Sequence, residues 1–193
     1  MKQRPRRALP AGNEAMSPYL LTGLIVLGAA VVFLTLPWTL PRTWYRALFY
    51  PGGRPNALAR RLNSGQARLS VLGVLPALMV ALETTGRRSG KACLVQLVVA
   101  QVGTERYLVS MLGENADWVR NVRASAGAAA LRYGRTEKVR LEEVPVSSRA
   151  PILKAYLQRA PGARPHFEVS RNAPLEEFDK VAARYPVFRI VAE

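Results

Sequence analysis

The sequence contains very few of the side chains that metal sites and nucleophilic sites most often use. It has one cysteine, Cys93, and one histidine, His166, in 193 residues. A single cysteine excludes an intramolecular disulfide and a cysteine-based zinc site built from this chain alone. A single histidine excludes a two-histidine metal site, and a Ser-His-Asp triad would have to use His166.

Acidic residues are also scarce. There are 13 Asp and Glu against 28 Lys and Arg, of which 23 are arginine, so the net charge is +15. Such an excess favours an anionic partner: nucleic acid, acidic lipid headgroups, or an anionic cofactor or substrate. A coding bias toward Arg and Ala would give the same composition. No run of five consecutive cations occurs, which argues against a nucleic-acid-binding tail.

No charged residue occurs between Ala15 and Pro41. Within this stretch, Tyr19–Leu36 is apolar, and as a helix it would span about 27 Å, close to the ~30 Å hydrocarbon core of a bilayer. Aromatic residues follow it, as at a membrane interface. We therefore expect a single-pass membrane protein with its folded domain in the cytoplasm. A signal peptide and a buried core helix are the alternatives.

The predicted domain organisation has four parts. We expect a disordered basic arm over 1–16, a transmembrane anchor over 17–41, an interfacial segment and linker over 42–68, and a folded domain over 69–193. Turn signals and a short helix at Asn56–Leu62 are expected within the third part.

The folded domain shows several short β-rich runs separated by Gly-containing turns. We predict strands at 78–84, 92–102, 106–111, 128–133, 137–144 and 187–191, and helices at 115–125, 147–159 and 175–184. Residues 161–171 are expected to form a loop. Short strands with helices inserted late in the chain predict an α+β fold built on a small antiparallel barrel.

The segment 82–91, LETTGRRSGK, is the most informative local pattern. Its two glycines allow a tight backbone path. The turn holds four donors that could bind an anion: Arg87, Arg88, Ser89 and Lys91. It is not a Walker A loop, because only three residues separate the glycines and Ala92 follows the lysine. A solvated hairpin turn is the alternative.

Together with 108–124, LVSMLGENADWVRNVRA, this segment resembles the deazaflavin-dependent nitroreductase family, and the resemblance covers roughly 70–192. It implies a split β-barrel similar to FMN-binding barrels. It also implies the deazaflavin coenzyme F-420, whose reduced form donates a hydride. A site with little His or Cys suits this chemistry, because hydride transfer needs no protein nucleophile.

The resemblance also implies which residues bind the cofactor. Arg88 would contact its anionic side, the strand 93–98 would run along its ring system, and 109–113 would form a phosphate-side loop. Two residues on one face of a helix would close the site. The implied set is Arg87, Arg88, Ser89, Lys91, Cys93, Val98, Ser110, Leu112, Gly113, Trp118 and Asn121.

The sequence departs from the family pattern at three positions. Cys93 stands where members commonly have Arg, Gln96 where they have Pro, and Glu114 lies near the expected phosphate. These departures leave FMN or haem as alternative cofactors.

We therefore expect a membrane-anchored oxidoreductase that passes a hydride from reduced deazaflavin to a hydrophobic quinone- or nitro-type acceptor, with His166 as a candidate proton donor. The expected partners are this small molecule and membrane lipid, and no metal site is predicted. The alternative is a non-catalytic basic barrel that binds anionic lipid or a membrane partner. The sequence leaves the acceptor and the oligomeric state open.

Overall fold

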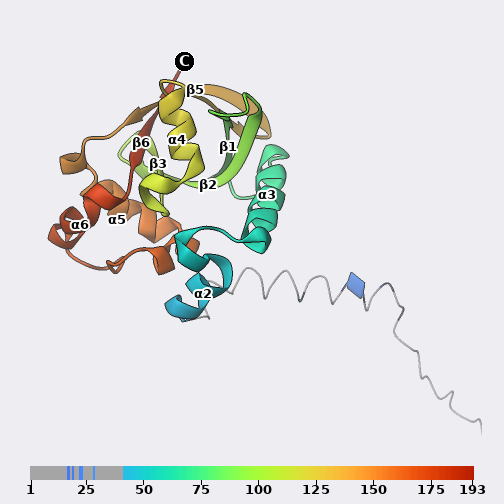
Figure 1. The fold of residues 1–193 in the computed structure, drawn as a ribbon, viewed down its shortest axis with the longest axis horizontal. Coiled ribbons are helices and arrows are strands. Elements are labelled where there is room, and N and C mark those ends of the chain that lie inside the picture. The colour runs from blue at the N-terminus through green and yellow to red at the C-terminus, as the bar shows by residue number, and fades with distance from the viewer. Residues whose placement is uncertain (1–16, 18, 20–21, 24–27, 29–40) are drawn as a thin grey trace, which may run out of the picture. The chain divides into compact units, whose positions relative to one another are not determined.

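The structure is a computed structural model that describes residues 17, 19, 22–23, 28 and 41–193. The chain divides into two compact units, 1–36 and 37–193, and the fold below is that of the second unit. The predicted basic arm and most of the predicted membrane span lie outside the described residues. Figure 1 shows the second unit as a strand barrel with helices on its surface.

Six antiparallel strands form the barrel. They are β1 (Met79–Thr85), β2 (Ala92–Val102), β3 (Glu105–Val109), β4 (Ala128–Tyr133), β5 (Arg135–Glu143) and β6 (Val187–Ala192). Each strand pairs with two neighbours in the closed order β1-β2-β3-β6-β5-β4. The predicted α+β fold on a small antiparallel barrel is therefore confirmed. All six predicted strands are present. β5 alternates the core residues Val139 and Leu141 with outward charged residues, whereas β2 is apolar along most of its length.

The barrel interior is apolar and is closed by helix α4 (Asp117–Ala124), which lies in front of the strands in Figure 1. Alternate residues of β1, such as Val80 and Leu82, point inward and pack against Trp118 and Val122 of this helix. A second core lies outside the barrel, under helices α5 (Ala150–Arg159) and α6 (Leu175–Val181).

Helix α3 (Ala57–Val71) packs against β1 and β2 and is longer than the predicted helix Asn56–Leu62. Asn56 caps it, because its Oδ1 accepts a hydrogen bond from the Ala59 N–H at 2.9 Å. Its later turns contain Asn63 and Ser70, which bond to Gln96 of β2. These long-range contacts stabilise a segment whose Ser and Gly favour turns, so sequence pattern alone underestimated the helix.

Helix α2 (Arg42–Phe49) precedes α3, and five short 3-10 turns connect other elements. They are η1 (Pro51–Gly53), η2 (Gly113–Asn115), η3 (Val146–Ser148), η4 (Pro161–His166) and η5 (Ala182–Arg184). Part of the predicted loop 161–171 is therefore η4. Two aromatic residues of α2 turn toward the fold, because Phe49 is buried and the Tyr45 and Phe49 ring centroids lie 5.2 Å apart, whereas Trp44 is 71% exposed.

The predicted localisation, a single-pass membrane protein, is wrong for the part of the chain that the structure describes. None of the helices there combines the length and the apolar character that crossing a bilayer requires. The longest, α3, carries three arginines between Arg60 and Arg68.

Candidate functional site

The turn between β1 and β2 is held in one shape by its own backbone. The Gly86 N–H donates to the Lys91 carbonyl and the Gly90 N–H donates to the Gly86 carbonyl, both at 2.8 Å. Gly90 has φ +65°, which a residue with a side chain rarely adopts. Gly86 has no room for a Cβ, which would lie 2.7 Å from Ser89 Oγ. The predicted tight glycine path therefore exists as a defined turn.

Arg87 points from this turn toward α4. Its guanidinium Nη1 lies 3.1 Å from Asp117 Oδ1 and 3.1 Å from Asn121 Oδ1, and its backbone N–H donates to the same Asn121 oxygen at 3.2 Å. Asn121 is buried, and its Nδ2 donates to Thr84 Oγ1 at 3.4 Å. Asn121 therefore fastens the turn to α4 with its whole amide group.

Arg88 and Lys91 point to solvent on the same turn. Within residues 41–193 neither side chain has a hydrogen bond or ion pair, and the neighbouring acid Glu83 is already paired with Arg132 at 2.6 Å. Ser89 Oγ accepts a hydrogen bond from the Lys91 N–H at 3.3 Å. Of the four predicted donors, Arg88 and Lys91 are therefore available to an anion, whereas Arg87 is already bonded to α4. That the turn binds an anion stays a prediction.

Cys93 follows the turn and is exposed, with its Sγ 3.6 Å from the Lys91 carbonyl oxygen. It was expected to be near the cofactor, and it does lie beside the turn. It adds a thiol there instead of the guanidinium that the family pattern would supply.

One edge of β2 is open next to the turn. The N-terminal half of β2 pairs with β1, but β3 pairs only with Val99–Val102. Asn63 covers the open edge at Gln96, because its side-chain amide bonds both the Gln96 N–H (3.2 Å) and the Gln96 carbonyl (3.4 Å). Backbone groups alternate sides along a strand, so those of Leu94 face the same open edge. No partner for them occurs among the described residues.

Burial along β2 agrees with this opening. Val95 and Leu97 point into the barrel, yet both are only partly buried. Leu94 is 40% exposed on the outer face. Val98, in contrast, packs against the cluster beneath α5. Residues 93–98 were expected to run along the cofactor. The part of this strand near the turn is accessible, whereas Val98 is not part of the accessible stretch.

The predicted phosphate-side loop folds on itself. Ser110 is buried, and its hydroxyl donates to the Gly113 carbonyl at 2.8 Å. Gly113 has φ +72°, and Leu112 between them is half-buried. Glu114 pairs with Arg123, with the shorter contact at 2.5 Å, and Arg123 also pairs with Glu143 at 2.6 Å. Glu114, which departs from the family pattern, is therefore in an ion pair. The loop is held by the hydrogen bond between Ser110 and Gly113.

Trp118 lies in the barrel core, where its ring meets Phe188 edge-on at a centroid distance of 5.4 Å. It is 8% exposed. The two residues expected to close the site thus share one helical face, as predicted, but that face points into the protein. Asn121 forms hydrogen bonds to Arg87 of the β1–β2 turn, and Trp118 packs in the barrel core.

His166 lies elsewhere, under α2. Its ring meets Tyr50 edge-on at a centroid distance of 4.3 Å, and its buried Nε2 has no hydrogen-bond partner among the described residues. Burial first, and the Arg46 charge second, lower the pKa of His166 to about 4. The imidazole is neutral at pH 7 and therefore a weak acid, so the structure gives no support for His166 as a proton donor at the turn.

Sequence reasoning missed Asp117, Thr84 and Asn63. Asp117 and Asn121 are four apart on one helix face, a spacing that could have suggested a contact with the arginine turn. The bond between Asn63 and Gln96 joins residues 33 apart and left no local signal. No group of three or more potential metal ligands occurs among the described residues.

A family model described as F420H(2)-dependent quinone reductase matches residues 56–173, which is more than half of the chain. No curated protein matches the chain.

Solved structures match it at low identity. An F420-H2 dependent reductase (FDR-A) is 20% identical, with 60% of this chain and 96% of that chain covered and a TM-score of 0.41. A conserved hypothetical protein from Mycobacterium tuberculosis is 15% identical (64% and 78% covered, TM-score 0.45). A heme binding protein from Mycobacterium smegmatis is 13% identical (66% and 51% covered, TM-score 0.43). At these TM-scores the similarities carry no functional argument.

Proposed function

This chain belongs to the F420H(2)-dependent quinone reductase family, and we propose that it binds the reduced deazaflavin coenzyme F-420 beside the β1–β2 turn and passes a hydride to a quinone-type acceptor. The family makes the chain an oxidoreductase. The cofactor's place on this chain and the identity of the acceptor are the proposal.

One observation carries the proposal: the open edge of β2 lies next to two cations that have no acidic partner in the part of the chain that the structure describes. Arg88 and Lys91 supply positive charge at the end of β2, where a phosphodiester or carboxylate could bind. Leu94 supplies a backbone N–H and carbonyl on the open edge, within two residues of the backbone groups that Asn63 covers. A flat heterocycle with donors and acceptors on its rim suits such an edge.

The residues present therefore fit the coenzyme. When bound, reduced F-420 supplies the hydride, so the chain needs no nucleophile of its own. The chain's contribution is positioning: Arg88 and Lys91 hold the anionic part, and the β2 edge orients the ring. Asn121 and Arg87 keep the turn in place from behind.

The accessible apolar surface next to this edge favours a hydrophobic acceptor. Leu94 is 40% exposed, and Val95 and Leu97 are only partly buried. A quinone- or nitro-type ring could contact such side chains at little desolvation cost. FMN would use the same cations and edge, so cofactor identity is tested by comparing the two ligands directly.

The proposal is tested by fluorescence titration of F-420 into the wild type and two single variants. Arg88→Ala should weaken binding roughly five- to 150-fold, the range of about 1–3 kcal/mol that a charge-assisted hydrogen bond contributes. Arg159→Ala is the matched control, because Arg159 is an exposed arginine on α5 and its loss changes the net charge equally.

Equal losses for Arg88→Ala and Arg159→Ala would mean that overall charge binds the cofactor, and a basic barrel without a defined site would then replace the proposal. Tighter binding of FMN than of F-420 would reassign the cofactor.

A further inference from the structure

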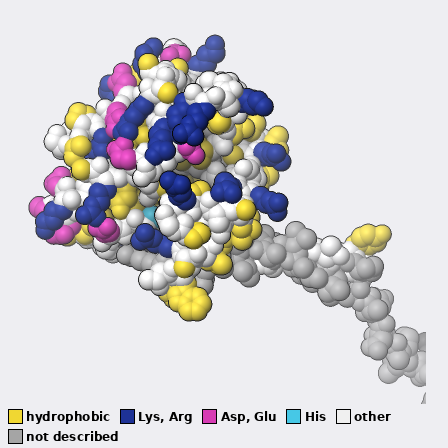
Figure 2. Space-filling model, in the orientation of Figure 1, with side chains coloured by type: hydrophobic (Ala, Val, Ile, Leu, Met, Phe, Trp, Pro, Cys, Tyr) yellow, Lys and Arg dark blue, Asp and Glu magenta, His cyan; other side chains and the backbone are white. Residues whose placement is uncertain are grey.

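The segment that contains α2 and α3 has no acidic side chain. No Asp or Glu occurs between Ala15 and Leu82, whereas six arginines lie between Arg42 and Arg68. Positive charge on this part of the surface is therefore not neutralised by nearby acids of the same segment. In Figure 2, cations and hydrophobic side chains lie next to each other over the region of α3.

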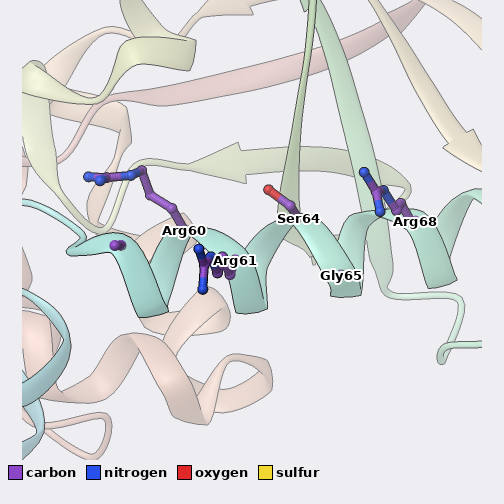
Figure 3. A pocket seen from close by; sticks show the side chains of 6 residues that line it. Arg60, Arg61, Ser64, Gly65 and Arg68 are labelled. Atoms are coloured by element: carbon purple, nitrogen blue, oxygen red, sulfur yellow. The ribbon is translucent and has the colours of Figure 1, made fainter.

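A shallow groove that is open to solvent runs along the outer face of α3. It is lined by Ala57, Arg60, Arg61, Ser64, Gly65 and Arg68. These residues form two adjacent rows at a spacing of four, so the groove lies between neighbouring ridges of one helix. Figure 3 shows Arg60 toward one end of the groove and Arg68 toward the other, with Ser64 and Gly65 between them.

The arginines of the groove keep donors available to a ligand. Arg60 uses one guanidinium nitrogen on the Pro55 carbonyl at 2.8 Å. Arg61 and Arg68 have no side-chain partner among the described residues. Ser64 adds an exposed hydroxyl. Guanidinium groups together with a hydroxyl are the donors that recognise a phosphate group.

Gly65 keeps the middle of the groove open. A Cβ added there would meet nothing within 4 Å, so neither packing nor a positive φ requires a glycine. Glycine in a helix interior destabilises the helix relative to alanine. Its use here is explained if a ligand needs the space.

An apolar stripe lies beside the arginines, on α3 and on the residue that ends it. Leu58 is 49%, Leu69 43% and Leu72 70% exposed. The opposite face of α3 is fixed to the barrel, where Ala67 is buried and Ser70 bonds Gln96 at 2.8 Å. The outer face therefore offers cations and apolar side chains at a rigid, fixed spacing.

We propose that the groove on α3 binds the phosphate group of an amphiphilic phosphate ester, whose apolar chain lies along the leucine stripe. Arg61 and Arg68 bind the phosphate oxygens, and Ser64 donates a hydrogen bond. Such a phosphate ester could be a phospholipid in a bilayer surface or a free amphiphile in solution. This site is separate from the cofactor site and does not depend on it.

The experiment measures binding of the full chain to three probes: monomeric dihexanoyl phosphatidic acid, phosphatidylcholine vesicles with and without phosphatidic acid, and inorganic phosphate. The double variant Arg61→Gln/Arg68→Gln should lower affinity for the monomeric amphiphile at least tenfold. Arg159→Gln/Arg171→Gln, which removes the same charge from exposed positions elsewhere, should change it less than twofold.

Gly65→Leu keeps the helix and fills the groove, so it should also weaken binding while the melting temperature stays at or above that of the wild type. If the protein binds both the monomeric phosphatidic acid and the vesicles that contain it, the groove accepts the ligand from either source. If it binds only these vesicles, the ligand is a phospholipid in a bilayer surface. Equal losses in the two double variants, or phosphatidic acid binding no tighter than inorganic phosphate, would overturn the proposal.

Discussion

The role of Asn121 as the fastener of the β1–β2 turn can be tested by Asn121→Ala. The substitution removes two hydrogen bonds from Arg87 and one to Thr84, and it leaves the Arg87 N–H without its acceptor. The Thr84 bond is long and contributes least. Net values of about 0.5–1.5 kcal/mol for a neutral bond, and more for the guanidinium bond, predict a loss of about 2–3 kcal/mol in unfolding free energy.

For a folded unit of this size, that loss corresponds to a drop in melting temperature of roughly 4–12 °C. Thermal unfolding followed by circular dichroism measures it. Asn172→Ala is the control, because Asn172 is exposed and its side chain makes no hydrogen bond among the described residues. F-420 affinity should fall less for Asn121→Ala than for Arg88→Ala, since the cations of the turn remain. An unchanged melting temperature with an Arg88-sized loss of affinity would refute the reasoning and place Asn121 against the cofactor.

Three further predictions concern the turn, the edge and the buried histidine. Gly86→Ala should destabilise the fold by about 1–3 kcal/mol, because its Cβ would lie 2.7 Å from Ser89 Oγ, and adding Ser89→Ala should recover part of the loss in the same thermal assay. Gln96→Pro removes the backbone N–H that donates a hydrogen bond to Asn63 Oδ1 and so loosens α3 from β2. Trypsin should then cleave within α3 faster than in the wild type, and an identical digestion rate would contradict the role of this bond in holding α3. The pKa of His166 is about 4 in the fold and about 6.5 for a solvated imidazole, so the unfolded chain gains a proton first, and stability should fall as the pH drops from about 6.5 to 4. His166→Phe should remove that part of the pH dependence, and an unchanged slope would show that other groups cause it.

The barrel could be predicted because its strands carry their own signal. β2 is a Val- and Leu-rich run bounded by glycine turns, and β4 and β5 flank Gly134. α3 could not be delimited in this way. Its last turns are helical because Asn63 and Ser70 find partners on β2, which is a tertiary contact rather than a local preference.

The candidate site was predictable only in part. The turn follows from glycine spacing, and Arg88 and Lys91 are exposed on it, but their role in binding the cofactor stays a prediction. The spacing of residues along a helix shows which of them share a face, but it does not show which way that face points. Trp118 and Asn121 do share a face, yet that face points into the barrel. His166 illustrates the same limit, because Tyr45 of α2 and Tyr50 just after it, both far away in the sequence, contact its ring.

The most direct test of the central claim is a single-turnover reaction under anaerobic conditions. Purified full-length protein is mixed with stoichiometric reduced F-420 and a soluble quinone, and the return of oxidised deazaflavin absorbance is followed over time. The account predicts protein-dependent oxidation of the coenzyme with matching formation of quinol, slowed in Arg88→Ala at sub-saturating coenzyme and unchanged in Arg159→Ala. No oxidation above the rate without protein, at coenzyme concentrations that saturate binding, would contradict it.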